Sequence, residues 1–164
     1  MLSVSNHVSK NLVKIRVCGG EPGPAQALGS KLGPLGLQAK KVNEDIIKQG
    51  KEWKGIRVPI YLHCQNREAK VFIKPTVSAL LIKDMGDYQR DRKKQKLANR
   101  AGNVTFQQIK NIAKAMQADG KSASREFVGT VTQVLGSALS LGCTVDGKNA
   151  KEVTEMVKSG ELKL

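Results

Sequence analysis

The sequence has few aromatic residues, few cysteines and no long apolar run, and each shortage argues against a class of protein. Aromatic side chains are 4% of the 164 residues, so few rings can be spared for stacking the bases of single-stranded RNA. The cysteines Cys18, Cys64 and Cys143 are odd in number, lie far apart and form no CxxC pair. They suggest neither a disulfide framework nor a zinc site, and we expect small buried thiols in a reducing compartment.

Neither a membrane segment nor a secretory signal is indicated. No apolar run approaches the ~20 residues that a membrane-spanning helix needs, and residues 1–20 lack the continuous apolar core of a signal peptide. We therefore expect a soluble, cytoplasmic protein without a membrane partner.

No group of residues indicates catalysis. The carboxylates are scattered, and His7 and His63 have no partner at the spacing of a metal site or a nucleophile. The glycine-rich stretch contains no GxGxxG, and Gly29-Ser30-Lys31 has the letters of a P-loop in the wrong order. We predict a protein that is not an enzyme and has no cofactor, no metal and no small-molecule substrate.

Positive charge is what the chain has in excess. Lys and Arg total 28 against 14 Asp and Glu, a formal net charge of +14. Residues 1–75 hold 13 basic and 5 acidic residues, a net of +8, so the remainder carries +6. A charge spread along the whole chain favours a polyanionic partner such as RNA, and the scarcity of rings favours recognition of a folded RNA by its shape and backbone. A basic surface kept only for solubility is the alternative.

The first half of the chain has the alternation of a small sheet. Residues 12–18 and 56–64 alternate apolar and polar side chains, and residues 70–74 return after a turn at 65–68. Pro59 indicates that the strand at 56–64 lies at a sheet edge. Residues 19–37 are a Gly/Pro-rich loop with a possible helical turn at 25–29, and a helix follows from Ala39 to Gly50.

Helical signals dominate after Pro75, which we interpret as a hinge between two domains. A short helix capped by Thr76 is predicted at 77–83, and Thr105 with Gln108 has the spacing of a capping box for a helix at 105–116. A third helix spans 124–141, and Asn149 is placed to cap a last one.

Two features of this half are candidates for RNA contact. Residues 84–100 have no apolar period, so their basic side chains belong in solvent or against phosphate; a solvated loop is the alternative. These are Arg90, Arg92, Lys93, Lys94, Lys96 and Arg100.

The second candidate is the helix at 124–141. One side carries Val128, Val131, Leu135 and Ala138 for the core, and the other carries Gly129, Gln133, Gly136, Ser137 and Ser140. Two glycines inside a helix imply that something approaches the backbone closely, either RNA or another helix.

Several motifs together resemble one family. Six segments are similar in order and spacing to the universal large-subunit ribosomal protein L-eleven, called L-twelve in eukaryotes. These are Gly19-Gly20-Glu21-Pro22-Gly23, Lys31-Leu32-Gly33-Pro34-Leu35-Gly36-Leu37, Gln65-Asn66-Arg67, Arg90-Asp91-Arg92-Lys93-Lys94-Gln95-Lys96, Gly102-Asn103 and Leu135-Gly136-Ser137-Ala138-Leu139-Ser140-Leu141-Gly142-Cys143. The likeness covers about residues 10–160.

The resemblance implies an α+β fold with two domains. Residues 1–74 would form an N-terminal α/β domain with a small three-stranded sheet and helices, on the side of the translation factors and the stalk. Residues 75–164 would form a C-terminal three-helix RNA-binding bundle. The protein would be a structural constituent of the large ribosomal subunit that binds the GTPase-associated-centre rRNA at the stalk base and helps to position translational GTPases.

The resemblance also implies partners and site residues. The partners would be large-subunit rRNA, the ribosomal stalk protein and, transiently, translational GTPases. The rRNA contacts would be the six basic residues named above with Asn103, Gly136, Ser137, Ala138 and Ser140. The factor-side loop would be Pro22, Gly23, Pro24, Gln26, Gly29, Lys31, Leu32, Gly33, Pro34, Leu35, Gly36 and Leu37.

Two positions depart from the family pattern. A polar or basic residue is usual where Leu139 stands, so Leu139 is left out of the predicted contacts. Gln26 and Ala27 replace prolines that help bacterial members to bind thiopeptide antibiotics, so sensitivity to these antibiotics is not carried over to this chain.

A protein–protein adaptor and a DNA-binding regulator are the rival functions. The regulator would need base-reading side chains along a helix, and beyond Arg125 at its start the helix at 124–141 offers only Gln133 among otherwise small and apolar residues.

Overall fold

The chain folds as two compact units with separate hydrophobic cores. The structure, a computed structural model, describes residues 11–23, 25–65, 68–86 and 102–162. The division between the units falls between Pro75 and Thr76, and each unit has its own cluster of buried apolar side chains. A sheet with helices in the first unit and mainly helices in the second confirm the predicted α+β class.

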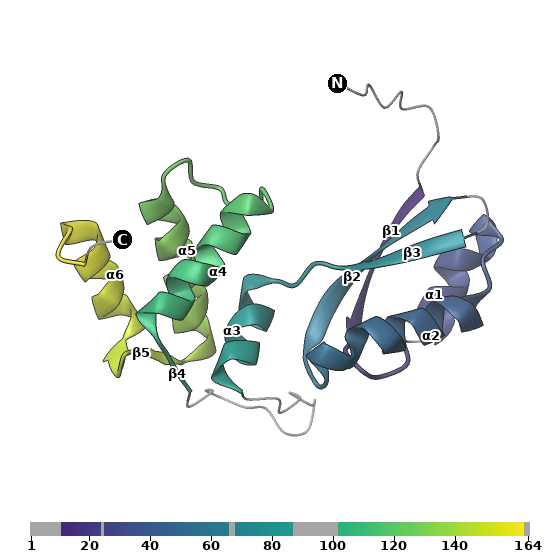
Figure 1. The fold of residues 1–164 in the computed structure, drawn as a ribbon, viewed down its shortest axis with the longest axis horizontal. Coiled ribbons are helices and arrows are strands. Elements are labelled where there is room, and N and C mark those ends of the chain that lie inside the picture. Colours follow the sequence, from purple (N-terminus) through teal and green to yellow (C-terminus); the bar gives the residue numbers. More distant parts are fainter. Residues whose placement is uncertain (1–10, 24, 66–67, 87–101, 163–164) are drawn as a thin grey trace. The chain divides into compact units, whose positions relative to one another are not determined.

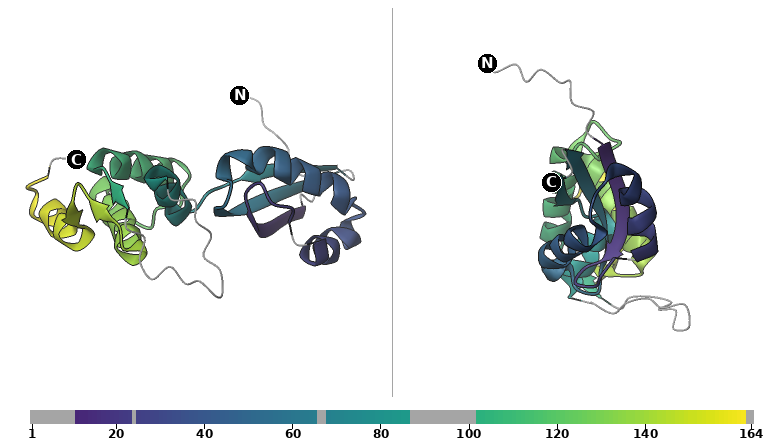
Figure 2. Two further views of the ribbon diagram at one scale, coloured as in Figure 1. Left: turned by 90° about the horizontal axis from the view of Figure 1, so that it is seen from below. Right: turned by 90° about the vertical axis from the view of Figure 1, so that its right-hand side faces the viewer.

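A three-stranded antiparallel sheet forms the centre of the N-terminal unit. Its strands β1 (Asn11–Cys18), β2 (Arg57–Gln65) and β3 (Glu68–Ile73) lie in the order β1-β2-β3 (Figures 1 and 2). Ile15 is opposite Ile60, and Ile60 is opposite Ile73. Because side chains alternate between the two faces of a strand, this register places the buried apolar residues Ile15, Ile60 and Val71 of the three strands on one face.

Pro59 lies in the central strand, so the prediction of an edge strand is wrong. Its carbonyl oxygen accepts a hydrogen bond of 3.3 Å from the Lys74 amide. The nitrogen and oxygen of a residue in an antiparallel strand point to the same side, so the nitrogen without a hydrogen also faces Lys74. That residue lies just beyond the end of β3 at Ile73. The proline is tolerated because it stands at the end of the ladder on that side, where the one hydrogen bond that joins it to Lys74 uses its carbonyl oxygen and needs no hydrogen on its nitrogen.

The glycine- and proline-rich segment contains a longer helix than predicted. Helix α1 (Ala25–Leu32) continues into a 3-10 turn, η1 (Gly33–Leu35), and the chain reverses at Gly36, whose φ is 66°. Leu28 and Leu32, four residues apart, are both buried and give α1 its apolar side. The glycines concealed this pattern because each lowers helix propensity by about 1 kcal/mol.

Helix α2 completes the N-terminal unit. It spans Ala39–Gln49 as predicted, and a 3-10 turn, η2 (Gly50–Trp53), leads into β2. Val42 and Ile46 of α2 pack with Leu28 and Leu32 of α1 into the cluster that covers the apolar face of the sheet.

The described part of the C-terminal unit contains four helices and a small sheet. The helices are α3 (Val77–Met85), α4 (Phe106–Ala118), α5 (Phe127–Leu141) and α6 (Ala150–Ser159). The small sheet consists of the two-residue strands β4 (Asn103–Val104), β5 (Thr144–Val145) and β6 (Lys148–Asn149). These strands were not predicted, because they are too short to show an alternation of apolar and polar residues. The unit is therefore helical as expected, but it holds one helix more than a three-helix bundle.

Side chains cap the helices of this unit where the sequence predicts. Thr76 accepts a hydrogen bond from the Ala79 amide, and Asn149 accepts one from the Lys151 amide. At α4 both halves of the predicted capping box are present: the Thr105 side chain accepts from the Gln108 amide, and the Gln108 side chain accepts from the Thr105 amide at 2.8 Å.

Removing this cap should destabilise α4. Because Thr105→Ala leaves the Gln108 amide without its acceptor, we expect a loss of about 1 kcal/mol, measured as faster amide hydrogen exchange along α4. Lys114→Ala, at an exposed position of the same helix, is the control and should stay within ~0.5 kcal/mol of the original protein. Equal protection in the two variants would contradict the capping role.

Candidate RNA-binding site

The rotation of α5 about its axis is set by a fully buried side. Val131, Val134, Leu135 and Ala138 are each 0% exposed and pack with residues of the other helices of the unit. Ala138 therefore lies in the core, and its side chain is removed from the predicted rRNA contacts. Val134 was not predicted as a core residue, although it is three positions from Val131 and so on the same side of the helix.

The opposite side of α5 is a surface of small and hydroxyl-bearing side chains without charge. None of the residues from Phe127 to Leu141 is charged, although the chain has a net charge of +14. The α5 face, as this surface is called below, consists of Gly129, Thr132, Gln133, Gly136, Ser137 and Ser140, which are half-buried or exposed.

Two apolar residues stand beside the α5 face. Leu139 is 47% exposed and Val128 is 38% exposed. The placement of Val128 in the core is therefore wrong. The two residues are eleven positions apart, which is close to three full helical turns, so they lie along one line of the helix surface.

The two glycines of the α5 face have different roles. A Cβ atom built on Gly129 would collide with the Ser124 hydroxyl and with the Ser124 Cβ at 2.7 Å, so close packing inside the protein accounts for this glycine. A Cβ on Gly136 would meet nothing within 4 Å. Within the described residues, no neighbouring atom requires a glycine at position 136. The surface at Gly136 is therefore open to another molecule.

Hydroxyl groups of the α5 face bond to the helix backbone. The Ser137 Oγ donates to the Gln133 carbonyl at 3.2 Å, and the Ser140 Oγ donates to the Ser137 carbonyl at 2.7 Å. Because each hydroxyl proton is used inside the helix, the remaining lone pairs offer acceptors. These acceptors suit donors such as the 2′-hydroxyl of ribose.

A cluster of hydroxyls fixes the turn before α5. Thr130 is 0% exposed, and its Oγ1 lies 2.7 Å from the Ser122 Oγ. The Ser124 Oγ accepts from the Glu126 amide at 3.2 Å. Residues 124–126 therefore form a bonded turn, and α5 begins at Phe127 rather than at Ser124 as predicted.

Asn103 lies beside the C-terminal end of α5. Its Oδ1 accepts from the Gly147 amide at 3.0 Å and lies 3.1 Å from the Thr144 Oγ1. The Gly102 carbonyl accepts from the Thr144 amide at 2.9 Å. The Asn103 side chain thus holds the small sheet together, and strand β4 is tied to the residues that follow α5.

The predicted basic contacts Arg90, Arg92, Lys93, Lys94, Lys96 and Arg100 lie outside the described residues. The positions on either side of them are described. A Cβ on Gly102 would be 3.0 Å from the Met85 Cγ, so the end of α3 and the start of β4 touch. The described positions on the two sides of residues 87–101 therefore lie together, close to the end of α5.

The predicted factor-side loop is split between core and surface. Leu28, Leu32 and Leu37 are buried. The side chains of Leu32 and Leu37, which were among the predicted contacts, therefore cannot touch a partner. The Gly23 amide donates to the Asn43 Oδ1 at 2.9 Å, which ties the start of the segment to α2.

The exposed part of this segment lies on α1 and η1. Gly29, Gly33, Pro34 and Gly36 are exposed, and a Cβ on any of the three glycines would meet nothing within 4 Å. Pro22 is also exposed and Leu35 is half-buried. Lys31 donates from Nζ to the Lys14 carbonyl of β1 at 3.0 Å. Pro24 lies outside the described residues, as does the side chain of Gln26.

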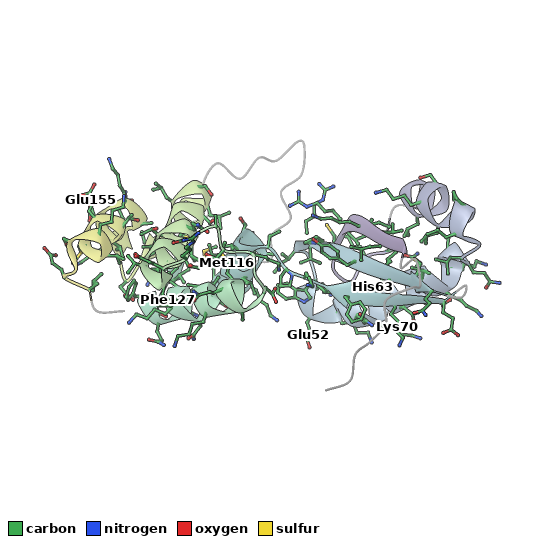
Figure 3. The ribbon with its side chains drawn as sticks, turned by 90° about the horizontal axis from the view of Figure 1, so that it is seen from above. Glu52, His63, Lys70, Met116, Phe127 and Glu155 are labelled. Atoms are coloured by element: carbon green, nitrogen blue, oxygen red, sulfur yellow. The ribbon has the colours of Figure 1, made fainter. Side chains whose placement is uncertain are left out.

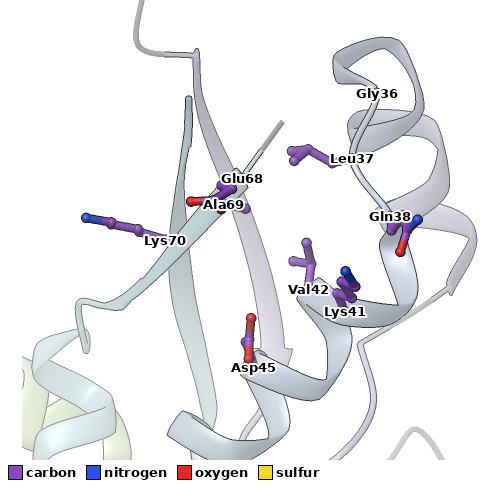
Figure 4. A pocket seen from close by; sticks show the side chains of 9 residues that line it. All are labelled: Gly36, Leu37, Gln38, Lys41, Val42, Asp45, Glu68, Ala69 and Lys70. Atoms are coloured by element: carbon purple, nitrogen blue, oxygen red, sulfur yellow. The ribbon is translucent and has the colours of Figure 1, made fainter. Parts of the chain in front are cut away.

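A pocket of about 530 Å³ adjoins the end of this segment (Figure 4). Gly36 and the first half of α2 line one side, and β3 lines the other. Helix α2 contributes one base and one acid to its lining, Lys41 and Asp45, whereas Glu68 and Lys70 line it from β3 positions whose side chains belong to the other face of the sheet. These charges are balanced and open to water, so the pocket has no arrangement typical of a catalytic or anion-binding site.

Cysteine and metal chemistry find no support in the described residues. Burial raises the pKa of the Cys64 and Cys143 thiols, which keeps both protonated and weakly nucleophilic at neutral pH. Within residues 11–23, 25–65, 68–86 and 102–162, no three His, Cys, Asp or Glu side chains gather as a metal site. No helix in these ranges is long and apolar enough to cross a membrane.

Two compact units with separate cores, the second of which carries the open α5 face, define a two-domain architecture. Residues 13–69 match the family model described as ribosomal protein L11, N-terminal domain, and residues 73–145 match ribosomal protein L11, RNA binding domain. The chain belongs to the ribosomal protein L11 family, whose members are structural proteins and not enzymes.

Relatives from plants and fungi match nearly the whole chain. The large ribosomal subunit protein uL11x of Arabidopsis thaliana and the protein uL11 of Neurospora crassa are each 48% identical over 151 residues, which are 92% of this chain and 90% of the relative. The protein uL11A of Schizosaccharomyces pombe is 46% identical over 150 residues, with the same two coverages.

The different roles of the two glycines predict opposite effects on stability. Gly136→Ala should stabilise α5 by up to about 1 kcal/mol because space is available and Ala is the better helix former. Gly129→Ala should destabilise it, because Ser124 must move. Adding Ser124→Gly to Gly129→Ala should restore part of the loss. Urea unfolding of the three variants, followed by circular dichroism, measures the order; a Gly129→Ala protein as stable as Gly136→Ala would refute the packing role.

Proposed function

We propose that the chain is a structural constituent of the large ribosomal subunit that binds a compactly folded rRNA at the stalk base, the GTPase-associated centre, through its C-terminal unit. The observation that carries this is the α5 face, an uncharged surface centred on the open Gly136 within a strongly basic chain. The match of residues 73–145 to an RNA-binding domain supports it.

The two candidate features divide the recognition between them. Phosphate contacts by basic side chains supply affinity and depend on salt, but they do not distinguish one folded RNA from another. The small residues around Gly136 allow the backbone of α5 to come close to a shallow RNA minor groove, where 2′-hydroxyls and sugar edges are displayed. The hydrogen bond between Gly102 and Thr144 holds the described residue that follows the basic segment near the end of α5, which supports a joint site for both kinds of contact.

The N-terminal unit would present its exposed α1–η1 surface to the stalk protein and, transiently, to translational GTPases. Gly29, Gly33 and Gly36 leave the backbone of this surface accessible, while Leu28 and Leu32 anchor it to the sheet. Pro75 would act as the hinge, since only Lys74 and Pro75 separate β3 from the Thr76 cap of α3. The protein would work on cytoplasmic ribosomes and position factors without chemistry of its own.

A bulky side chain at Gly136 should abolish specific RNA binding without unfolding the protein. Gly136→Gln places a long side chain in the open space above α5, so the fold is kept and a close-lying RNA is excluded. Binding of the full chain to the folded stalk-base rRNA segment, with an unrelated hairpin as competitor, measures the effect. Ser159→Gln, an exposed position at the end of α6, is the matched control; undiminished binding by the Gly136 variant would remove the α5 face from the site.

Neutralising the basic segment should flatten the salt dependence of binding. Replacing Arg90, Arg92, Lys93, Lys94 and Lys96 by Gln removes charges that displace counterions from RNA. Each lost phosphate contact should lower the slope of log K against log salt by about 0.7–0.9. An unchanged slope would show that these residues do not touch phosphate, and binding that ignores salt altogether would favour the rival function of a protein adaptor.

A further inference from the structure

One face of the N-terminal sheet has no covering layer among the described residues of its unit. Helices α1 and α2 pack with Ile15, Ile60 and Val71, which point to the other face. The register places Lys14, Tyr61 and Phe72 side by side across all three strands on the uncovered face. The next row of this face is Leu12, His63 and Lys70. This surface is called the open sheet face below.

Aromatic side chains occupy neighbouring positions of the open sheet face and form a band there. The His63 and Phe72 rings meet edge to face with their centroids 4.8 Å apart, and the Lys14 Nζ lies 5.3 Å from the centre of the Tyr61 ring. Phe72 is 46% exposed, and Leu12, in the row of His63, is 55% exposed. Figure 3 shows His63 and Lys70 among the side chains of this unit. Two exposed large apolar side chains, Leu12 and Phe72, therefore lie on this one face, whereas exposed apolar residues on a surface are normally scattered.

Basic side chains surround this band. Lys14 and Arg16 of β1, Arg57 of β2 and Lys70 of β3 all occupy positions of the open sheet face and are exposed. Glu68, at the far end of β3, is the one acidic residue of the described strands on this face. Four positive charges against one negative leave an excess of +3 beside the rings.

We propose that the open sheet face is a second RNA-binding surface, which takes a single-stranded stretch of RNA. Bases would stack on the exposed ring of Phe72 and on the neighbouring Tyr61 and His63, since every base has a π-face and such stacking tolerates any sequence. Arg16, Arg57 and Lys70 would bind the phosphates. Because side chains on neighbouring strands stand about 5 Å apart, the band is wide enough for about two bases.

Charge complementarity favours RNA over a protein partner on this face. An apolar protein interface is depleted of charged side chains at its centre, whereas Lys14 lies over the Tyr61 ring in the middle of the band. A cation beside an aromatic platform is the combination that single-stranded nucleic acid uses. The surface is separate from the α5 face, which belongs to the other unit, so this inference goes beyond the function proposed above.

The test is a titration of the full chain with an unstructured oligouridylate of about 10 nucleotides, followed by two-dimensional NMR. Residue-by-residue shifts give a Kd at the amides of Lys14, Tyr61 and His63, undisturbed by RNA bound elsewhere on the chain. We expect these amides to move and to saturate. Shifts confined to residues 76–162 would overturn the proposal.

Three substitutions of Phe72 separate stacking from apolar contact. Phe72→Ala should raise the Kd measured at these amides by about fivefold or more, and Phe72→Tyr, which keeps the ring, should leave it close to the original value. Phe72→Leu keeps an apolar side chain but no π-face, so it should behave like Phe72→Ala. If Phe72→Leu binds as the original chain does, stacking is refuted and an apolar surface for a protein partner takes its place.

Two pairs of substitutions separate a site from general attraction. Arg16→Ala with Lys70→Ala should weaken binding more than Lys40→Ala with Lys48→Ala, which removes the same charge from exposed positions of α2. Equal losses would reduce the surface to a non-specific positive charge and overturn the proposal. Binding of the stalk-base rRNA by the Phe72→Ala chain should be retained, and it reports on the α5 face separately, so either conclusion can fail without the other.

Discussion

Burial of one side of α5 is the constraint on which the RNA-facing surface depends. Val131, Val134, Leu135 and Ala138 have no exposed area, and turning the helix about its axis would bring their side chains into water at about 1.5–3 kcal/mol for each large residue. The helix therefore cannot rotate, and Gly136 must face outward. The buried Thr130 helps to fix this orientation, because its hydroxyl lies 2.7 Å from the Ser122 hydroxyl and also donates to the Glu126 carbonyl at 3.3 Å.

The same one-sided burial shapes the N-terminal unit. In a strand the period is two residues, so the register that buries Ile15, Ile60 and Val71 also decides which residues point away from the helices. Leu28 and Leu32 then fix α1 against the covered face and leave Gly29 and Gly33 outside. In both units the contact surfaces follow from the core, since each is the side of an element that the core does not use.

Local chemistry was predictable from the sequence, and long-range placement was not. The capping box of Thr105 and Gln108 and the strand alternation need only neighbouring residues, and both are present as predicted. Pro59 was misplaced because its tolerance depends on where β3 ends, in another part of the chain. Val128 was assigned to the core from spacing alone, yet α5 begins only at Phe127, where the turn held by Ser124 ends.

The site shows the same division. Small residues at 129 and 136 pointed to close approach, but the sequence does not say which molecule approaches, and only the position of Ser124 separates the two glycines. The aromatic residues were counted as too few for base stacking. Their number is indeed small, but Phe72, Tyr61 and His63 come from two strands and meet on one face. A count along the chain treats these rings as scattered, whereas strand pairing concentrates them. Scarcity in the composition therefore does not exclude a stacking surface when the register of a sheet gathers the few rings that exist.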